Sequence, residues 1–101
     1  MTVTLYQPGQ QPQVVGAGGF IIHPESGEIV QNAARAAELL GCVIGSVDVL
    51  ACGSGYLIYS VFDYEGDVNA DAMTAFSKIT GVVLSSADDE VLQGPILVVL
   101  V

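Results

Sequence analysis

The stretch Gly53-Ser54-Gly55 is the part of the sequence whose residue types most suggest chemistry, because serine between glycines occurs in nucleophile sites and phosphate loops. A nucleophile elbow has glycine two residues either side of its serine, and here those positions hold Cys52 and Tyr56. A phosphate loop leads into a helix and carries a lysine, whereas an apolar run, Leu57–Phe62, follows here. We therefore predict a turn between two strands, formed by Cys52, Gly53, Ser54 and Gly55.

His23 is the only histidine, and we expect it to end a strand before Pro24 rather than to act as an acid or a base. A zinc site would need His23 together with Cys42 and Cys52, which lack the close cysteine spacing of such sites. We therefore predict no catalytic residue, no metal and no cofactor, and a function that is not enzymatic.

The alternating polar residues of segment 63–71 resemble a calcium loop only in part. Gly66 stands at the fourth position of this series rather than the sixth, and Thr74 replaces the bidentate glutamate. A solvated turn before a helix is the expected structure.

Charge and hydropathy exclude several classes of function. The chain of 101 residues is 51% hydrophobic, and its two basic residues face eleven acidic ones, for a net charge of −9. So few cations argue against binding to nucleic acid or to anionic membranes. The longest strongly apolar run, Ile96–Val101, is too short to span a bilayer, and no signal segment is recognised. We expect a single cytoplasmic domain over residues 1–101, with apolar surface covered by another copy or by a partner.

Two helices and six strands are expected. The apolar spacing from Ile29 to Leu40 predicts a helix ending at Gly41, and Asn69 is expected to cap a second helix ending at Gly81. The strands are expected at Val3–Tyr6, Gly19–His23, Cys42–Leu50, Tyr56–Phe62, Val82–Ser85 and Ile96–Val101.

The two halves of the chain echo each other at a shift of forty residues, which places Gly41 on Gly81 and Leu57 on Leu97. We predict an α+β fold of the ferredoxin-like order β-α-β-β-α-β, with an extra strand at each end. Both helices are expected on one side of the sheet.

Several motifs occur in a shared order between Gly19 and about Ala75. The alanine-rich run E-I-V-Q-N-A-A-R-A-A-E-L-L-G is followed by C-V-I-G at 42–45 and by G-S-G-Y-L-I-Y-S-V at 53–61. Gly66-Asp67-Val68 then precedes N-A-D-A. In this order the segment resembles the bacterial microcompartment shell domain, although the lysine usual at the tile edge has no counterpart here.

This resemblance implies a self-assembling structural protein that forms flat cyclic hexamers. It also implies that Gly53, Ser54 and Gly55 line a central pore, which Cys52 borders. The loop would line a pore because cyclic symmetry places the same loop of every subunit around the axis of the ring.

The alternative is a small ferredoxin-like binding or regulatory protein that acts through a protein partner. The apolar last strand would then be an exposed edge that pairs with another chain, with Ile96, Val98 and Leu100 as the interface. Acidic residues in two loops would meet a basic protein; these are Asp63, Glu65, Asp67, Asp88, Asp89 and Glu90.

Overall fold

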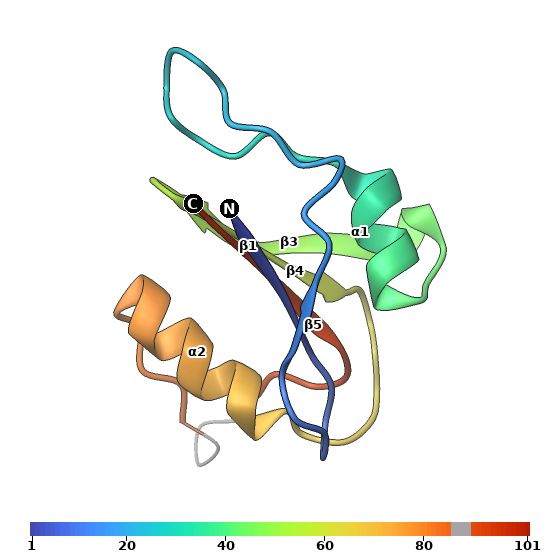
Figure 1. Ribbon diagram of the computed structural model, residues 1–101. Coiled ribbons are helices and arrows are strands. Elements are labelled where there is room, and N and C mark those ends of the chain that lie inside the picture. Colours follow the sequence, from blue (N-terminus) through green and yellow to red (C-terminus); the bar gives the residue numbers. More distant parts are fainter. Residues whose placement is uncertain (86–89) are drawn as a thin grey trace.

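An antiparallel sheet of five strands organises the chain, in the order β2-β1-β5-β4-β3 (Figure 1). The computed structural model describes residues 1–85 and 90–101. A helix packs against each face of the sheet, so the predicted α+β class is confirmed. The elements in chain order are β1 (Thr2–Tyr6), β2 (Gln13–Val15), α1 (Ala33–Leu40), the 3-10 turn η1 (Ile44–Ser46), β3 (Val47–Gly53), β4 (Tyr56–Val61), α2 (Ala70–Thr80) and β5 (Ile96–Leu100).

The apolar strand β5 lies in the middle of the sheet, between β1 and β4. Successive side chains of a strand point to opposite faces. Leu97 and Val99 therefore enter the core under α1, and Ile96 and Val98 enter the core under α2. The unbroken apolar run is explained because both faces of this strand are covered.

The two helices lie on opposite faces of the sheet (Figure 1). Ala36 and Leu40 of α1 share a core with Tyr59, whereas Ala72 and Phe76 of α2 share a core with strand residues of the other face. The prediction that both helices lie on one side is wrong. Apolar residues at successive positions of β4 and β5 give the sheet two apolar faces, and each face needs a cover.

Both helix C-termini and the start of α2 follow the predicted signals, but α1 begins at Ala33 rather than at Ile29, which pairs with Ile22 instead. Asn69 caps α2, with its side chain accepting a hydrogen bond from the Ala72 amide, and Gly41 and Gly81 end the two helices in the left-handed conformation. Only glycine adopts this conformation without steric cost. Asn32, which the apolar pattern did not indicate, caps α1 in the same way as Asn69 caps α2.

The predicted strand Gly19–His23 is absent and leaves only one bridge, between Ile22 and Ile29. Side chains of the first helix engage this region instead. Arg35 donates to the carbonyl oxygens of Gly18 (3.0 Å) and Gly16 (3.4 Å), and the Asn32 side chain donates to Gly19 (2.8 Å). These carbonyls are therefore held against α1, and the edge strand on this side of the sheet is β2.

Segment 82–85 is not a strand, and β3 begins at Val47 rather than at Cys42 because residues 44–46 form η1. The order β-α-β-β-α-β consequently runs from β2 to β5, preceded by β1. The strand predicted at Ile96–Val101 is formed as β5, but it is the last strand of this unit rather than an extra one, because segment 82–85 is not a strand.

The forty-residue echo does not extend to the packing. Leu57 and Leu97 occupy equivalent places in the two halves, and both side chains lie in the core under α1. In a true repeat Leu97 would face α2, because Leu57 faces the helix of its own half.

Candidate functional site

The Gly-Ser-Gly segment is a tight hairpin turn. Ser54 and Gly55 connect β3 to β4, and Gly53 pairs with Tyr56 across the turn. Gly55 has φ +83°, which side chains rarely tolerate, and a Cβ on Gly53 would lie 2.6 Å from Cε1 of Tyr56. Gly55 is thus favoured by the backbone of the turn, and Gly53 leaves room for the Tyr56 ring.

The hairpin presents few groups for chemistry. Ser54 is exposed, and Cys52 is an exposed free thiol. The turn leads into β4, so its amides are not at a helix N-terminus where an anion binds. What the turn offers to another molecule is a small, polar tip.

His23 has a local structural role. Its Nδ1 accepts hydrogen bonds from the amides of Glu25 (3.2 Å) and Ser26 (3.4 Å), which closes the exposed turn that follows it. Within residues 1–85 and 90–101, no group of three or more His, Cys, Asp or Glu side chains is placed to hold a metal ion.

The acidic residues predicted to meet a partner lie on the connector between β4 and α2. Asp63, Glu65 and Asp67 are all exposed there, and Asp63 has φ +54°, which Asp tolerates better than most residues. Glu90 is exposed as well, whereas Asp88 and Asp89 lie outside the described residues.

Asn69, within the same alternating series, points into the core and is only 1% exposed. Its Nδ2 donates to the carbonyl oxygens of Tyr6 (2.9 Å) and Gly94 (2.8 Å), and its Oδ1 accepts from the Ala72 amide (3.2 Å). Every polar group of this side chain is used within the chain, so Asn69 is not available as a metal ligand.

The predicted interface along the last strand is wrong. Ile96 and Val98 are at most 2% exposed, and Leu100 is half-buried beside the core under α2. β5 has a hydrogen-bonded neighbour on each side, so it offers no free edge to another chain.

A hollow of about 220 Å³ lies at the end of the sheet where β3 begins and β4 ends. Asp48 and Leu50 of β3 line one side, and Phe62, Asp63 and Tyr64 line another. The sequence does not reveal this hollow, because β3 and the connector between β4 and α2 come together only in the fold. The sequence signal that could have indicated it is the pair of aromatic residues Phe62 and Tyr64 on either side of Asp63. Both rings are exposed in the fold.

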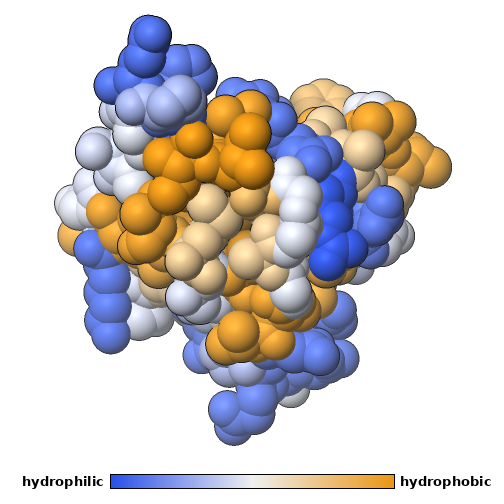
Figure 2. All heavy atoms as spheres, turned by 45° about the horizontal axis from the view of Figure 1, so that its top comes forward, coloured by the Kyte–Doolittle hydropathy of each residue, from blue (hydrophilic) through white to orange (hydrophobic). Residues whose placement is uncertain are grey.

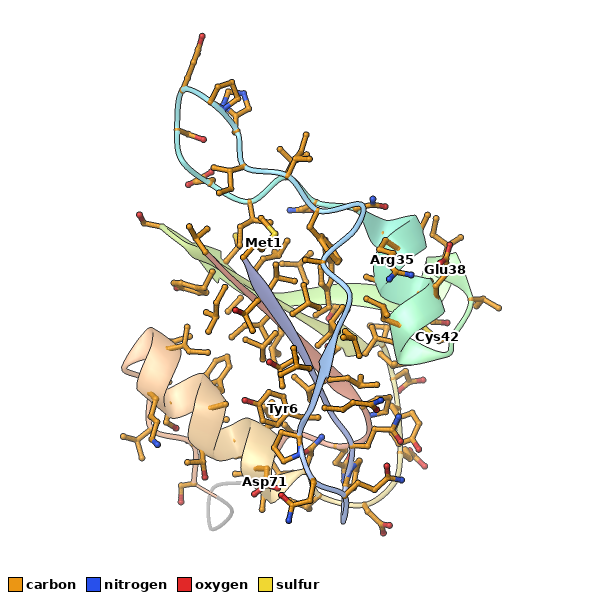
Figure 3. All side chains as sticks on the ribbon, in the orientation of Figure 1. Met1, Tyr6, Arg35, Glu38, Cys42 and Asp71 are labelled. Carbon is orange, nitrogen blue, oxygen red and sulfur yellow. The ribbon has the colours of Figure 1, made fainter. Side chains whose placement is uncertain are left out.

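Two tyrosines have shifted pKa values. Burial raises the pKa of Tyr6, and the nearby negative charge of Asp71 raises it further. Figure 3 shows the Tyr6 side chain over the first turn of α2, where Asp71 lies. Burial also raises the pKa of Tyr59, and the hydrogen bond from the Asn32 amide to its hydroxyl (2.9 Å) lowers it in part.

Two pairs of exposed valine and isoleucine residues follow the two helices. Val43 and Ile44, which we call the α1-end pair, are 72% and 59% exposed. Val82 and Val83, the α2-end pair, are 50% and 79% exposed. The segments after α1 and α2 lie on opposite sides of the molecule (Figure 1).

Apolar side chains also gather in separate groups on the face shown in Figure 2, where polar residues divide the group on the right from those in the centre. The right of this view is the side on which Figure 1 places α1 and η1. The exposed apolar surface is therefore split between different parts of the molecule.

Comparison with models of known protein families, with curated proteins and with solved structures found no match for this chain. Among the helices of the described residues, none has the length and apolar character needed to cross a bilayer.

Proposed function

We propose that this chain is a non-enzymatic structural protein that assembles with copies of itself. The observation that carries the proposal is the exposure of the α1-end pair and the α2-end pair on opposite sides of one subunit. Exposed apolar groups of this kind mark surfaces that other molecules cover.

A head-to-tail contact uses the two pairs together. The α1-end pair of one copy would pack against the α2-end pair of the next, which makes a heterologous interface. Such an interface leaves one pair free at each end of a dimer, so assembly continues until a ring closes or a filament forms.

The resemblance to microcompartment shell subunits supplies a specific form of this assembly, a cyclic hexamer with the hairpin at its axis. The hairpin tip is small and exposed at Ser54, which suits close approach of several subunits around an axis. The ferredoxin-like assignment rests only on the element order from β2 to β5. The strand order of the sheet and the placement of the helices on opposite faces do not contribute to it.

A mixing experiment tests the head-to-tail contact. Val43→Asp and Val83→Asp each place a charge on an exposed position of one pair, and each should leave the protein monomeric in light scattering. The cost of burying the new charge, or of losing one apolar side chain, is about 2 kcal/mol, which corresponds to roughly thirtyfold in Kd.

The two variants mixed in equal amounts should form a heterodimer, because each retains the pair that the other lacks. Ile21→Asp, which changes an exposed loop residue outside both pairs, serves as the control and should assemble as the unchanged protein does. A protein that is monomeric at micromolar concentration, or a mixture that stays monomeric, would contradict the proposal.

A second candidate function is the binding of a basic protein partner. The exposed carboxylates of Asp63, Glu65 and Asp67 favour it, since they lie together on one connector. Loss of assembly in the variants above would leave this second function intact, because neither variant touches the connector.

A further inference from the structure

The outer edge of β3 and the hollow beside it form a surface that the head-to-tail contact does not use. β3 is the last strand on its side of the sheet, and it pairs only with β4 in the part of the chain that the structure describes. With seven residues it is the longest strand described, whereas the opposite edge strand, β2, has three. A long free edge offers backbone N–H and C=O groups to another strand.

One feature of β3 makes pairing with a second copy of itself unfavourable. The relevant feature is charge. Asp48 places an exposed carboxylate on the same strand, and charges on an edge discourage pairing between copies of an acidic chain. The edge therefore favours a partner strand of opposite charge.

The hollow next to this edge has the chemistry to receive a cationic side chain. Its carboxylates are those of Asp48 and Asp63, and the exposed rings of Phe62 and Tyr64 stand on the same rim. Aromatic rings and carboxylates together attract the cationic heads of arginine and lysine. The basic residues of the chain, Arg35 and Lys78, do not line the hollow.

The ring of Tyr64 is set in position by two glycines. Ideal Cβ atoms built on Gly66 and Gly94 would overlap it, so the ring lies directly against the backbone at these two positions. The aromatic wall of the hollow is thus part of the folded structure.

We propose that this surface binds an extended, basic segment of a partner protein. The segment adds as a strand to the free edge of β3 and places an arginine or lysine side chain in the hollow between Asp48 and Asp63. Backbone hydrogen bonds supply affinity in this mode of recognition, and the side-chain pocket supplies selectivity. The site is independent of the α1-end and α2-end pairs, so its test and the test of assembly can fail separately.

The probe is a fluorescein-labelled peptide of alternating arginine and valine, with a glutamate–valine peptide of equal length for comparison. Fluorescence anisotropy should show binding of the arginine peptide alone. Asp48→Asn, Asp63→Asn and Phe62→Ala should each weaken binding about threefold. Glu25→Gln, an exposed position outside the hollow, removes the same charge as the aspartate variants and should change the affinity less than twofold.

Amide hydrogen exchange gives a second readout, because strand addition should protect amides in residues 47–53 when the arginine peptide is present. Three results would each overturn the proposal. These are the absence of binding, equal weakening by Glu25→Gln and the hollow variants, and binding without protection of β3. The last two indicate attraction to the overall negative charge.

Discussion

Asn69 shows how one buried side chain connects separate parts of this chain. It caps α2, and it also holds the end of β1 and the segment before β5 through the carbonyls of Tyr6 and Gly94. Its own amide donates to the Leu92 carbonyl (2.7 Å). A capping signal was readable from the sequence, but the two long-range acceptors were not.

Asn69→Asp should destabilise the protein strongly. The aspartate keeps an acceptor for the helix cap, yet it loses both donated hydrogen bonds and buries a charge against two carbonyls. We expect a loss of about 3 kcal/mol in the free energy of unfolding, measured in urea. The matched control is Asn32→Asp, which loses one donated bond in an exposed position and should cost about 1 kcal/mol. Equal losses would show that the long-range bonds of Asn69 contribute nothing.

Tyr59 gives the chain a pH dependence on the alkaline side. Its pKa in the folded protein is raised above the ordinary value of 10.0, so the folded state resists ionisation of this phenol. The stabilisation is fully present below pH 10.0 and is lost as the pH rises through the folded pKa.

Tyr59→Phe should therefore flatten part of the alkaline decline in stability, measured by urea unfolding between about pH 8 and pH 11. At neutral pH the variant should lose about 1 kcal/mol, because the Asn32 amide loses its acceptor. An unchanged alkaline slope would contradict this role of Tyr59, and the remaining slope is expected from Tyr6, whose pKa is also raised.

At the scale of elements, the structure of the β3–β4 hairpin explains why glycine occurs at two of its positions. Gly55 supplies the positive φ of the turn, and Gly53 leaves room for the ring of Tyr56 on the opposite strand. An aromatic ring that covers a cross-strand glycine is a known way to stabilise a sheet. This local packing explains Gly53, and the turn explains Gly55, without any chemical role.

A double-mutant cycle tests this packing. Gly53→Ala alone should cost about 1 kcal/mol, because the new Cβ displaces the Tyr56 ring. In the background of Tyr56→Ala, which removes the ring, the same change should cost much less. Ser54→Ala, at the exposed tip, is the control and should stay within about 0.5 kcal/mol of the unchanged protein. Additive costs in the cycle would contradict the contact.

At the scale of the whole molecule, the place of the hairpin in the proposed ring is open to a direct test. Cys52 is exposed beside the turn, and Cys42 is half-buried. If the hairpins meet at the axis, Cys52 residues of neighbouring subunits approach to the roughly 4.4–6.8 Å between Cα atoms that a disulfide needs.

Mild oxidation of the Cys42→Ser variant should then give disulfide-linked dimers within the intact oligomer, visible on non-reducing gels. The Cys52→Ser variant, which retains Cys42, should give none. An oligomer that forms without any Cys52 cross-link would place the hairpin away from the axis and remove the pore from the proposal.

Local features were predictable because they depend on near neighbours in the chain. The Asn69 cap, the Gly41 and Gly81 ends and the Gly53–Gly55 turn follow from backbone conformations that few residue types allow. The apolar run at 96–100 likewise predicted a strand. The position of this strand in the sheet could not be predicted, because an apolar run suits a central strand and an edge strand that pairs with another chain equally well.

The sequence by itself determined the α+β class, the C-terminal ends of both helices, the cap of α2, the hairpin and the scarcity of positive charge. The tertiary structure decided that β5 is central, that the helices cover opposite faces, and that Asp48, Asp63 and Tyr64 line one hollow. The physical reason is that pairing between strands and the choice of face depend on contacts between residues far apart in the chain. Alternative pairings between strands compete with one another, and the residue types within one segment do not indicate which pairing forms.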